Sequence, residues 1–277
     1  MKVRDLLGAA TQRLGGGDAR LDAEILLAHA LGVSRAKLYA WPEYEPDVVA
    51  REAFERLVAA RADGEPIAYL TGRREFWSLD LVVTPAVLIP RPETELLVEL
   101  ALERIAADSE VRVADLGTGS GAIALAVASE RPRARIVATD ASADALAVAR
   151  GNAVRLGIGH VTFVHGDWCE ALGHERFDVI VSNPPYIAAG DAHLETGDLR
   201  REPRSALVAG TDGLDAIRRI VATSPAHLDA GGWLLLEHGW DQAASVRALF
   251  DAGGYVGVVS VRDGGGHERV TFGRMRA

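Results

Sequence analysis

Two hydrophobic patterns divide the chain. Over residues 1 to about 63, apolar residues recur three and four positions apart, which predicts amphipathic helices that bury one face. The first of these repeats consists of Val3, Leu6, Leu7, Ala10 and Leu14. Glycines at 15–17 and at Gly32 interrupt the pattern and indicate breaks between helices. We therefore expect a small helical domain over residues 1–75.

After the helical pattern the residues become typical of strands, with apolar runs at 79–83 and 86–89 around Pro85. These runs predict a short hairpin, within a linker that we place at residues 76–92. Pro92 is followed by acidic and then apolar residues, which predicts the start of a helix, because the first helical turn tolerates proline.

Beyond residue 110, short apolar segments alternate with helical ones, which predicts an α/β domain over residues 93–277 with helices on both faces of a sheet. The expected strands are 111–116, 134–139, 160–165, 177–182, 232–237, 255–261 and 268–273. Only a turn at 263–266 separates the last two strands, which is too short for a parallel crossover, so these two should run antiparallel. The long polar segment 187–212 is a candidate substrate loop or lid.

The composition is that of an ordinary globular protein, with 48% hydrophobic and 25% charged residues. A net charge of −9 argues against binding to the phosphate backbone of nucleic acids, which depends on clustered Lys and Arg. Cys169 is the only cysteine, which excludes an intramolecular disulfide and a cysteine-based zinc site. The N-terminus lacks a secretory apolar segment and no run approaches the roughly 18 apolar residues of a membrane helix, so we expect a cytoplasmic protein.

The first candidate binding element is a glycine-rich turn between a strand and a helix. It reads Gly117-Thr118-Gly119-Ser120-Gly121. Glycines let the backbone approach a ligand closely and adopt dihedrals that a Cβ forbids. The helix expected to begin near Ser120 offers free N–H groups that suit a carboxylate as well as a phosphate. A turn that binds nothing could use the same residues, so this motif alone does not establish a cofactor site.

Two further elements follow the next two strands. Asp140 ends the second strand, where a carboxylate can accept hydrogen bonds from both hydroxyls of a ribose. After the third strand, Asp167 could accept from an adenine amino group and Trp168 could pack on the ring. Helix caps and a core tryptophan would explain each residue separately. Together, three such elements at one edge of a parallel sheet predict a nucleoside site.

The fourth strand runs into the tetrapeptide Asn183-Pro184-Pro185-Tyr186. An amide or aromatic amine nitrogen is a poor nucleophile because its lone pair is delocalised, so it must be held in line for a group transfer. The Asn183 side-chain oxygen and the Pro184 carbonyl oxygen can accept its two N–H groups, and Tyr186 can stack on the flat acceptor. The alternative is a rigid turn, since Asn-Pro and Pro-Pro are common turn dipeptides.

The histidines and one arginine-rich segment have simpler interpretations. His165, His193, His238 and His267 show no metal-ligand spacing, so we interpret them as solvated or core residues and expect no metal. The segment 200–204, Arg-Arg-Glu-Pro-Arg, is interpreted as a solvated loop face, with contact to an acidic or polypeptide partner as the alternative.

Several motifs spread over nearly the whole length carry a resemblance to one family. They are Gly64-Glu-Pro-Ile-Ala-Tyr-Leu-Thr-Gly72, Glu75-Phe-Trp-Ser78, Ile89-Pro-Arg-Pro-Glu-Thr-Glu95, the glycine turn within 115–125, Ser182-Asn-Pro-Pro-Tyr-Ile187, Glu237-His-Gly239 and Glu268-Arg-Val-Thr-Phe-Gly273. With these motifs the chain closely resembles the release factor glutamine methyltransferase family, also called PrmC or HemK. Adenine-N6 DNA methyltransferases share the asparagine-containing tetrapeptide, so the flanking motifs decide the resemblance.

The resemblance implies a class I S-adenosyl-L-methionine-dependent methyltransferase domain, Rossmann-like, whose mostly parallel seven-stranded sheet has one antiparallel strand. It implies that Gly117 to Gly121, Asp140 and Trp168 hold this cofactor, and that Asn183 through Tyr186 hold an acceptor glutamine. We add Asp167 and Asn183 to the expected cofactor contacts.

The implied reaction is methylation of the side-chain nitrogen, N5, of the glutamine in the Gly-Gly-Gln motif of bacterial peptide chain release factors. The implied partner is the release factor, which the N-terminal helical domain is expected to bind, and we expect neither direct contact with nucleic acid nor contact with a membrane.

Other functions share parts of this evidence. A nucleic-acid amino methyltransferase would use the same tetrapeptide but should add a basic region that this acidic chain lacks. A ribosomal-protein glutamine methyltransferase would share the chemistry and differ in its N-terminal motifs. A non-enzymatic nucleoside-binding or haem-related module would require the tetrapeptide to be incidental.

Overall fold

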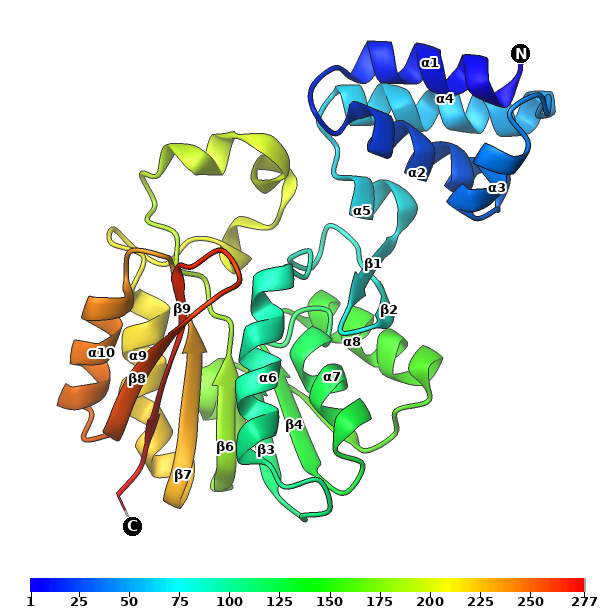
Figure 1. Ribbon diagram of the computed structural model, residues 1–277. Helices are drawn as coiled ribbons and strands as arrows, with labels where there is room; N and C mark the ends of the chain where they lie inside the picture. The colour runs from blue at the N-terminus through cyan, green and yellow to red at the C-terminus, as the bar shows by residue number, and fades with distance from the viewer. Residues whose placement is uncertain (277) are drawn as a thin grey trace. The chain divides into compact units, whose positions relative to one another are not determined.

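The computed structural model describes residues 1–276, which form two compact units (Figure 1). One unit, named the helical unit here, comprises Met1–Arg73 together with His193–Arg201. The other, the sheet unit, comprises Arg74–Ala192 and the chain from Glu202 onward. The helical unit is therefore assembled from two separate stretches of sequence, and the second stretch lies within the loop that follows the Asn-Pro-Pro-Tyr motif.

The N-terminal stretch of the helical unit contains five α-helices. They are α1 (Val3–Leu14), α2 (Ala19–Leu31), α3 (Arg35–Ala40), α4 (Val48–Ala62) and α5 (Ile67–Thr71). The apolar faces predicted for this region pack together, with Leu26 and Leu27 of α2 fully buried against Phe54 of α4. Gly32 ends α2 in the left-handed conformation, with φ 63°, which explains the break read from the sequence.

A short hairpin opens the sheet unit, but it lies upstream of the predicted one. Its strands are β1 (Arg73–Phe76) and β2 (Leu79–Val82). Trp77 and Ser78 close the turn with φ values of 51° and 58°. The prediction that residues 86–89 form the second arm is wrong, because they form no strand. The flanking prolines, Pro85 and Pro90, have no N–H to donate to a ladder.

The main sheet has seven strands in the order β5-β4-β3-β6-β7-β9-β8 (Figure 1). They are β3 (Arg112–Leu116), β4 (Arg135–Asp140), β5 (Val161–His165), β6 (Phe177–Ser182), β7 (Leu228–Glu237), β8 (Val256–Arg262) and β9 (Glu268–Arg274). The strands from β5 to β7 are parallel, whereas β9 runs antiparallel to both β7 and β8. This confirms the predicted fold class and the antiparallel final pair.

Helices cover both faces of this sheet. They are α6 (Glu95–Arg104), α7 (Ala122–Glu130), α8 (Ala143–Leu156), α9 (Asp215–Thr223) and α10 (Ala243–Ala252). Successive residues of β6 point to opposite layers: Val179 and Val181 pack with α6 and α7, and Ile180 packs with α9 and α10. Burial on both faces explains why the strands read as continuous apolar runs. No helix within residues 1–276 has the length and apolar content that crossing a membrane requires.

Candidate active site

A cavity of about 290 Å³ opens at the carboxyl edge of the parallel strands, within the sheet unit. Nine of the predicted site residues line it: Gly117, Thr118, Gly119, Ser120, Asp140, Asp167, Trp168, Asn183 and Pro185. Three others, Gly121, Pro184 and Tyr186, lie outside the lining. The loops after β3, β4, β5 and β6 all contribute, because parallel strands deliver their carboxyl ends to one edge of a sheet.

The glycine turn after β3 adopts backbone conformations that favour glycine. Gly117, Gly119 and Gly121 have φ values of 73°, 56° and 85°. A Cβ at Gly117 would lie 3.0 Å from the Trp168 ring, so the absence of a side chain lets the indole pack against the turn. A Cβ at Gly119 would meet nothing within 4 Å, which leaves open space over a cavity-lining backbone. Gly121 is the N-cap of α7.

Asp115, which the sequence analysis does not single out, anchors this turn from inside the core. Its Oδ2 accepts hydrogen bonds from Thr118 Oγ1 at 2.7 Å and from the Ala124 N–H at 3.1 Å. Burial raises the pKa of Asp115 to about 7, and its Oδ1 has no hydrogen-bond partner in the described part of the chain. The signal that could have identified it is an acidic residue inside an otherwise apolar strand.

Asp140 joins two loops at the edge of the cavity. Its Oδ2 accepts from the Gly119 N–H at 2.9 Å, and its Oδ1 accepts from the Ser142 N–H at 2.8 Å. Asp140 thus bonds the backbone of Ser142, the N-cap residue of α8, which is close to the helix-cap alternative raised from the sequence. This bond does not exclude a ligand, because each carboxylate oxygen can accept a second hydrogen bond.

Asp167 and Trp168 form the next part of the wall. Asp167 Oδ2 pairs with Arg219 of α9, whose other terminal nitrogen bonds Glu170 Oε1 at 2.6 Å. Arg219 was missed, since nothing in the sequence relates α9 to the turn after β5. Trp168 has φ 46°, a conformation that is strained for a residue with a side chain. Its ring packs against the part of the core formed with α9 and α10, and it also lines the cavity.

Asn183 is held by a residue that the sequence analysis did not single out. Its Nδ2 donates to Thr94 Oγ1 at 3.0 Å, and both residues line the cavity. Thr94 belongs to η1 (Pro92–Thr94), immediately before α6. Because Nδ2 is used in this bond, the side-chain oxygen of Asn183 remains as the acceptor for another group.

Tyr186 is fixed at both its hydroxyl and its backbone. The hydroxyl donates to Glu237 Oε1 at 3.3 Å, and the carbonyl oxygen accepts from Gln242 Nε2 at 2.9 Å. A Cβ at Gly213 would lie 2.2 Å from this carbonyl oxygen, so only glycine fits there. Burial, followed by the nearby Glu237, raises the pKa of Tyr186 well above its usual value. These contacts hold Tyr186, the last residue of the motif, in place.

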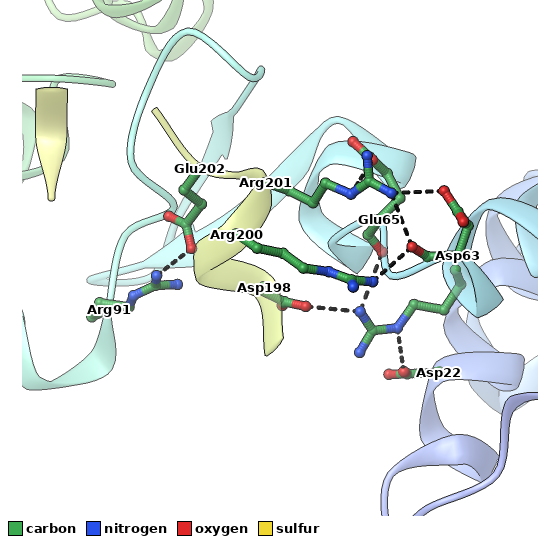
Figure 2. Close-up of polar contacts among 9 residues, drawn as sticks. Asp22, Asp63, Glu65, Arg91, Asp198, Arg200, Arg201 and Glu202 are labelled. Atoms are coloured by element: carbon green, nitrogen blue, oxygen red, sulfur yellow. Dashed lines mark hydrogen bonds and ion pairs between the residues drawn. The ribbon is translucent and has the colours of Figure 1, made fainter. Parts of the chain in front are cut away.

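Glu202 bonds a residue of the cavity lining, Arg91, and precedes other lining residues in the sequence. Its buried carboxylate accepts from the Ile89 N–H at 3.0 Å and pairs with Arg91 (Figure 2). The residues that follow it line the cavity: Pro203, Ser205 and Ala206. The interpretation of segment 200–204 as a solvated loop face is therefore wrong for Glu202.

The two arginines of the segment are exposed, as that interpretation expects, and they also form bonds within the helical unit (Figure 2). Arg200 and Arg201 each donate to the Asp63 carbonyl oxygen, at 2.7 and 3.0 Å, and Arg201 also bonds the Asp63 carboxylate at 2.7 Å. A Cβ at Gly64 would lie 1.6 Å from an Arg200 nitrogen, so glycine makes room for this guanidinium. Arg61 bridges Asp22 and Asp198, with 2.8 Å to each.

Comparisons with known proteins cover nearly the whole chain. One family model, the PrmC N-terminal domain, matches residues 5–72, and another, the methyltransferase small domain, matches residues 93–210. A release factor glutamine methyltransferase from Xylella fastidiosa is 57% identical over 97% of this chain and 96% of its own length. The same enzyme from Pseudomonas aeruginosa is 55% identical over 92% of each chain.

A solved structure gives the same fold. A T. Thermophilus 16S rRNA methyltransferase in complex with AdoMet and guanosine is 22% identical, with a TM-score of 0.56. The match covers 74% of this chain and 50% of that one. At this identity the likeness describes the fold alone.

Proposed function

The chain belongs to the release factor glutamine methyltransferase family, and on this premise we propose that it methylates a glutamine side-chain amide of a bacterial peptide chain release factor. The methyl donor is S-adenosyl-L-methionine, and the acceptor is N5 of the glutamine in the Gly-Gly-Gln motif. The observation that carries the proposal is a single cavity lined both by the elements that we assign to the nucleoside, including Asp140, and by Asn183.

The residues present fit this cofactor. An open, left-handed glycine turn at the start of α7 can receive a carboxylate, and Asp140 retains acceptor capacity for ribose hydroxyls. Asp167 and Trp168 are assigned to the adenine amino group and ring. When bound, S-adenosyl-L-methionine supplies an electrophilic methyl group on a positively charged sulfur.

Asn183 and Pro184 are assigned to the acceptor. The Asn183 side-chain oxygen and the Pro184 carbonyl oxygen accept the two N–H groups of the substrate amide, which orients its nitrogen and favours a pyramidal state with an available lone pair. The same two oxygens stabilise the positive charge that develops on the nitrogen. No general base is required before the transfer, because the methylated nitrogen is strongly acidic and loses its proton to water.

Pro185 and Tyr186 complete the assignment. Pro185 lines the cavity beside the acceptor position, and the rigid Pro-Pro backbone keeps the Pro184 carbonyl in place. Tyr186, whose hydroxyl and carbonyl are both hydrogen-bonded, holds the turn, and we assign its ring to stacking on the flat acceptor group.

The release factor is the assigned partner, and the helical unit is assigned to hold it. An acidic chain with a net charge of −9 has little attraction for nucleic acid. We therefore assign a protein acceptor in the cytoplasm rather than a nucleic-acid acceptor.

The direct test is mass spectrometry of a purified release factor after incubation with the enzyme and isotope-labelled S-adenosyl-L-methionine. We expect one labelled methyl group on the glutamine of the Gly-Gly-Gln motif. A release factor without label at that glutamine, under conditions in which the enzyme binds the cofactor, would contradict the proposal.

Asp140→Ala should weaken cofactor binding by about 10- to 100-fold, since each lost charge-assisted hydrogen bond contributes about 1.5 to 3 kcal/mol. Calorimetric titration of the folded variant measures this loss. Asp144→Ala, which removes an exposed carboxylate from the first turn of α8, is the matched control and should bind normally. Equal affinities of the two variants would remove Asp140 from the cofactor site.

A further inference from the structure

The side chain of Gln242 joins three backbone segments of the sheet unit. Its Nε2 donates to the Tyr186 carbonyl oxygen at 2.9 Å and, over a longer distance of 3.4 Å, to the Asp212 carbonyl oxygen. Its Oε1 accepts from the Gly239 N–H at 2.8 Å. Tyr186 ends the Asn-Pro-Pro-Tyr motif, Asp212 ends the polar segment 187–212, and Gly239 follows β7. One amide group therefore connects three separate turns.

The backbone partners determine the orientation of this amide. A backbone N–H only donates and a backbone carbonyl only accepts, so Oε1 faces Gly239 and Nε2 faces Tyr186 and Asp212. A reversed amide would place its NH2 group against an N–H and its oxygen against two carbonyl oxygens. An ionised glutamate of the same shape could satisfy only the Gly239 end, because it has no N–H to donate. The three contacts together require an amide.

The backbone of Gln242 is itself held at the start of α10. Gln242 is the N-cap residue, its N–H donates to the Gly239 carbonyl oxygen at 3.0 Å, and its carbonyl oxygen accepts from the Val246 N–H at 3.0 Å. A side chain at this position commonly accepts from the first N–H groups of the helix, but the Gln242 side chain makes no such bond. Its amide serves the three turns instead of capping the helix.

The chain that leaves the motif is closed into a loop at the same place. The Ile187 N–H donates to the Leu207 carbonyl oxygen at 2.9 Å, and the Ala209 N–H donates to the Ile187 carbonyl oxygen at 3.0 Å. A Cβ at Gly213 would lie 2.8 Å from Gln242 Nε2, so glycine leaves room for the amide. The bonds of Gln242 thus reach the residues on either side of this closure, and they tie the base of the loop to the end of the motif.

We propose that Gln242 is a positioning residue that holds the Asn-Pro-Pro-Tyr turn, and the base of the loop after it, in the geometry that the acceptor requires. Gln242 lies outside the cavity lining, so it acts through the Tyr186 carbonyl and does not touch the substrate. The inference rests on the proposed function, in which Asn183 and Pro184 accept from the substrate amide. These two residues precede Tyr186 by three and two positions, so a displaced Tyr186 backbone displaces their oxygens as well.

Two variants of the full-length enzyme test the proposal. Gln242→Glu keeps the length of the side chain but places an oxygen against the two carbonyl oxygens, and Gln242→Met keeps the approximate size and removes both ends of the amide. Each should lower kcat at saturating release factor by about 10-fold or more, because the proposed reaction depends on position. Cofactor affinity, measured by calorimetric titration, should stay within about twofold of wild type, because the residues assigned to the nucleoside follow other strands.

Ala244→Glu is the matched control, since it adds the same charge at an exposed position in the first turn of α10 and should behave as the wild type. A kcat within twofold of wild type in either folded Gln242 variant would overturn the proposal. A loss of cofactor affinity as large as the loss of kcat would also overturn it, because it would indicate a general disturbance of the cavity. If one variant does not fold, the other is judged by the same criteria.

A readout without turnover separates this proposal from the proposed function. Amide hydrogen exchange of the enzyme alone should become faster at Ile187 and Ala209 in Gln242→Glu, and it should stay unchanged at Leu235 in the middle of the sheet. Unchanged protection of Ile187 and Ala209 would refute the role of Gln242, whatever the substrate. If these two amides do exchange faster but wild-type enzyme fails to methylate a release factor, the proposed acceptor is wrong and the hold of Gln242 on the turn stands.

Discussion

Asn183→Ala should lower kcat for release factor methylation by about 10²-fold or more, the loss typical of removing one group that stabilises a transition state. In the proposed mechanism the Asn183 oxygen acts on the acceptor nitrogen as positive charge develops there, so its removal should affect the transition state more than the bound ground state. The variant should bind S-adenosyl-L-methionine nearly as tightly as the wild type, because the other residues proposed to bind the nucleoside belong to other loops of the cavity.

Two measurements separate these effects. Single-turnover kinetics at saturating release factor give the rate of transfer, and calorimetric titration gives the cofactor affinity. A transfer rate near that of the wild type would contradict the role of Asn183. An equal loss of rate and of cofactor affinity would instead assign Asn183 to the cofactor.

The second large effect should come from the substrate. Replacing the acceptor glutamine of the release factor by asparagine should lower the rate of transfer by about 10²-fold, because one methylene fewer withdraws the nitrogen by about 1 Å. The mechanism relies on position and has no strong nucleophile to compensate for this distance. Equal labelling of the glutamine and asparagine forms would contradict it.

Duplex DNA belongs in the same experiment, because adenine also presents a planar NH2 group to Asn183 and Pro184. An adenine in a duplex must be flipped out at a free-energy cost of a few kcal/mol, normally offset by basic groove and phosphate contacts. With a net charge of −9, this chain should leave duplex DNA unlabelled. Strong labelling of DNA would overturn the protein assignment.

The strands and the order of the site elements could be predicted from sequence because both depend on local pattern. Strands buried on both faces are continuous apolar runs, and parallel strands bring the residues after them to one edge. This is why Gly119, Asp140 and Asn183, which follow three different strands, line one cavity.

The supporting contacts could not be predicted, because they join residues that are far apart in sequence. Asn183 and Thr94 are 89 positions apart, and Glu202 and Arg91 are 111 apart. Nothing in the local composition of segment 200–204 distinguishes a buried glutamate and two paired arginines from a solvated surface. The hairpin was predicted in the wrong place for a related reason. Its turn depends on left-handed backbone conformations at Trp77 and Ser78, and neither residue type favours that conformation.

The membership of residues 193–201 in the helical unit has a consequence for protein engineering and for recombination between relatives. A truncation that starts the chain near residue 86 would remove Arg61 and Asp63. These two residues are the bonding partners of Asp198, Arg200 and Arg201. The segment that loses these partners is followed in the sequence by Glu202 and by residues that line the cavity. A chimera that inherits its first 73 residues from one parent therefore needs residues 193–201 from the same parent, so the two stretches form one unit of exchange although the chain separates them.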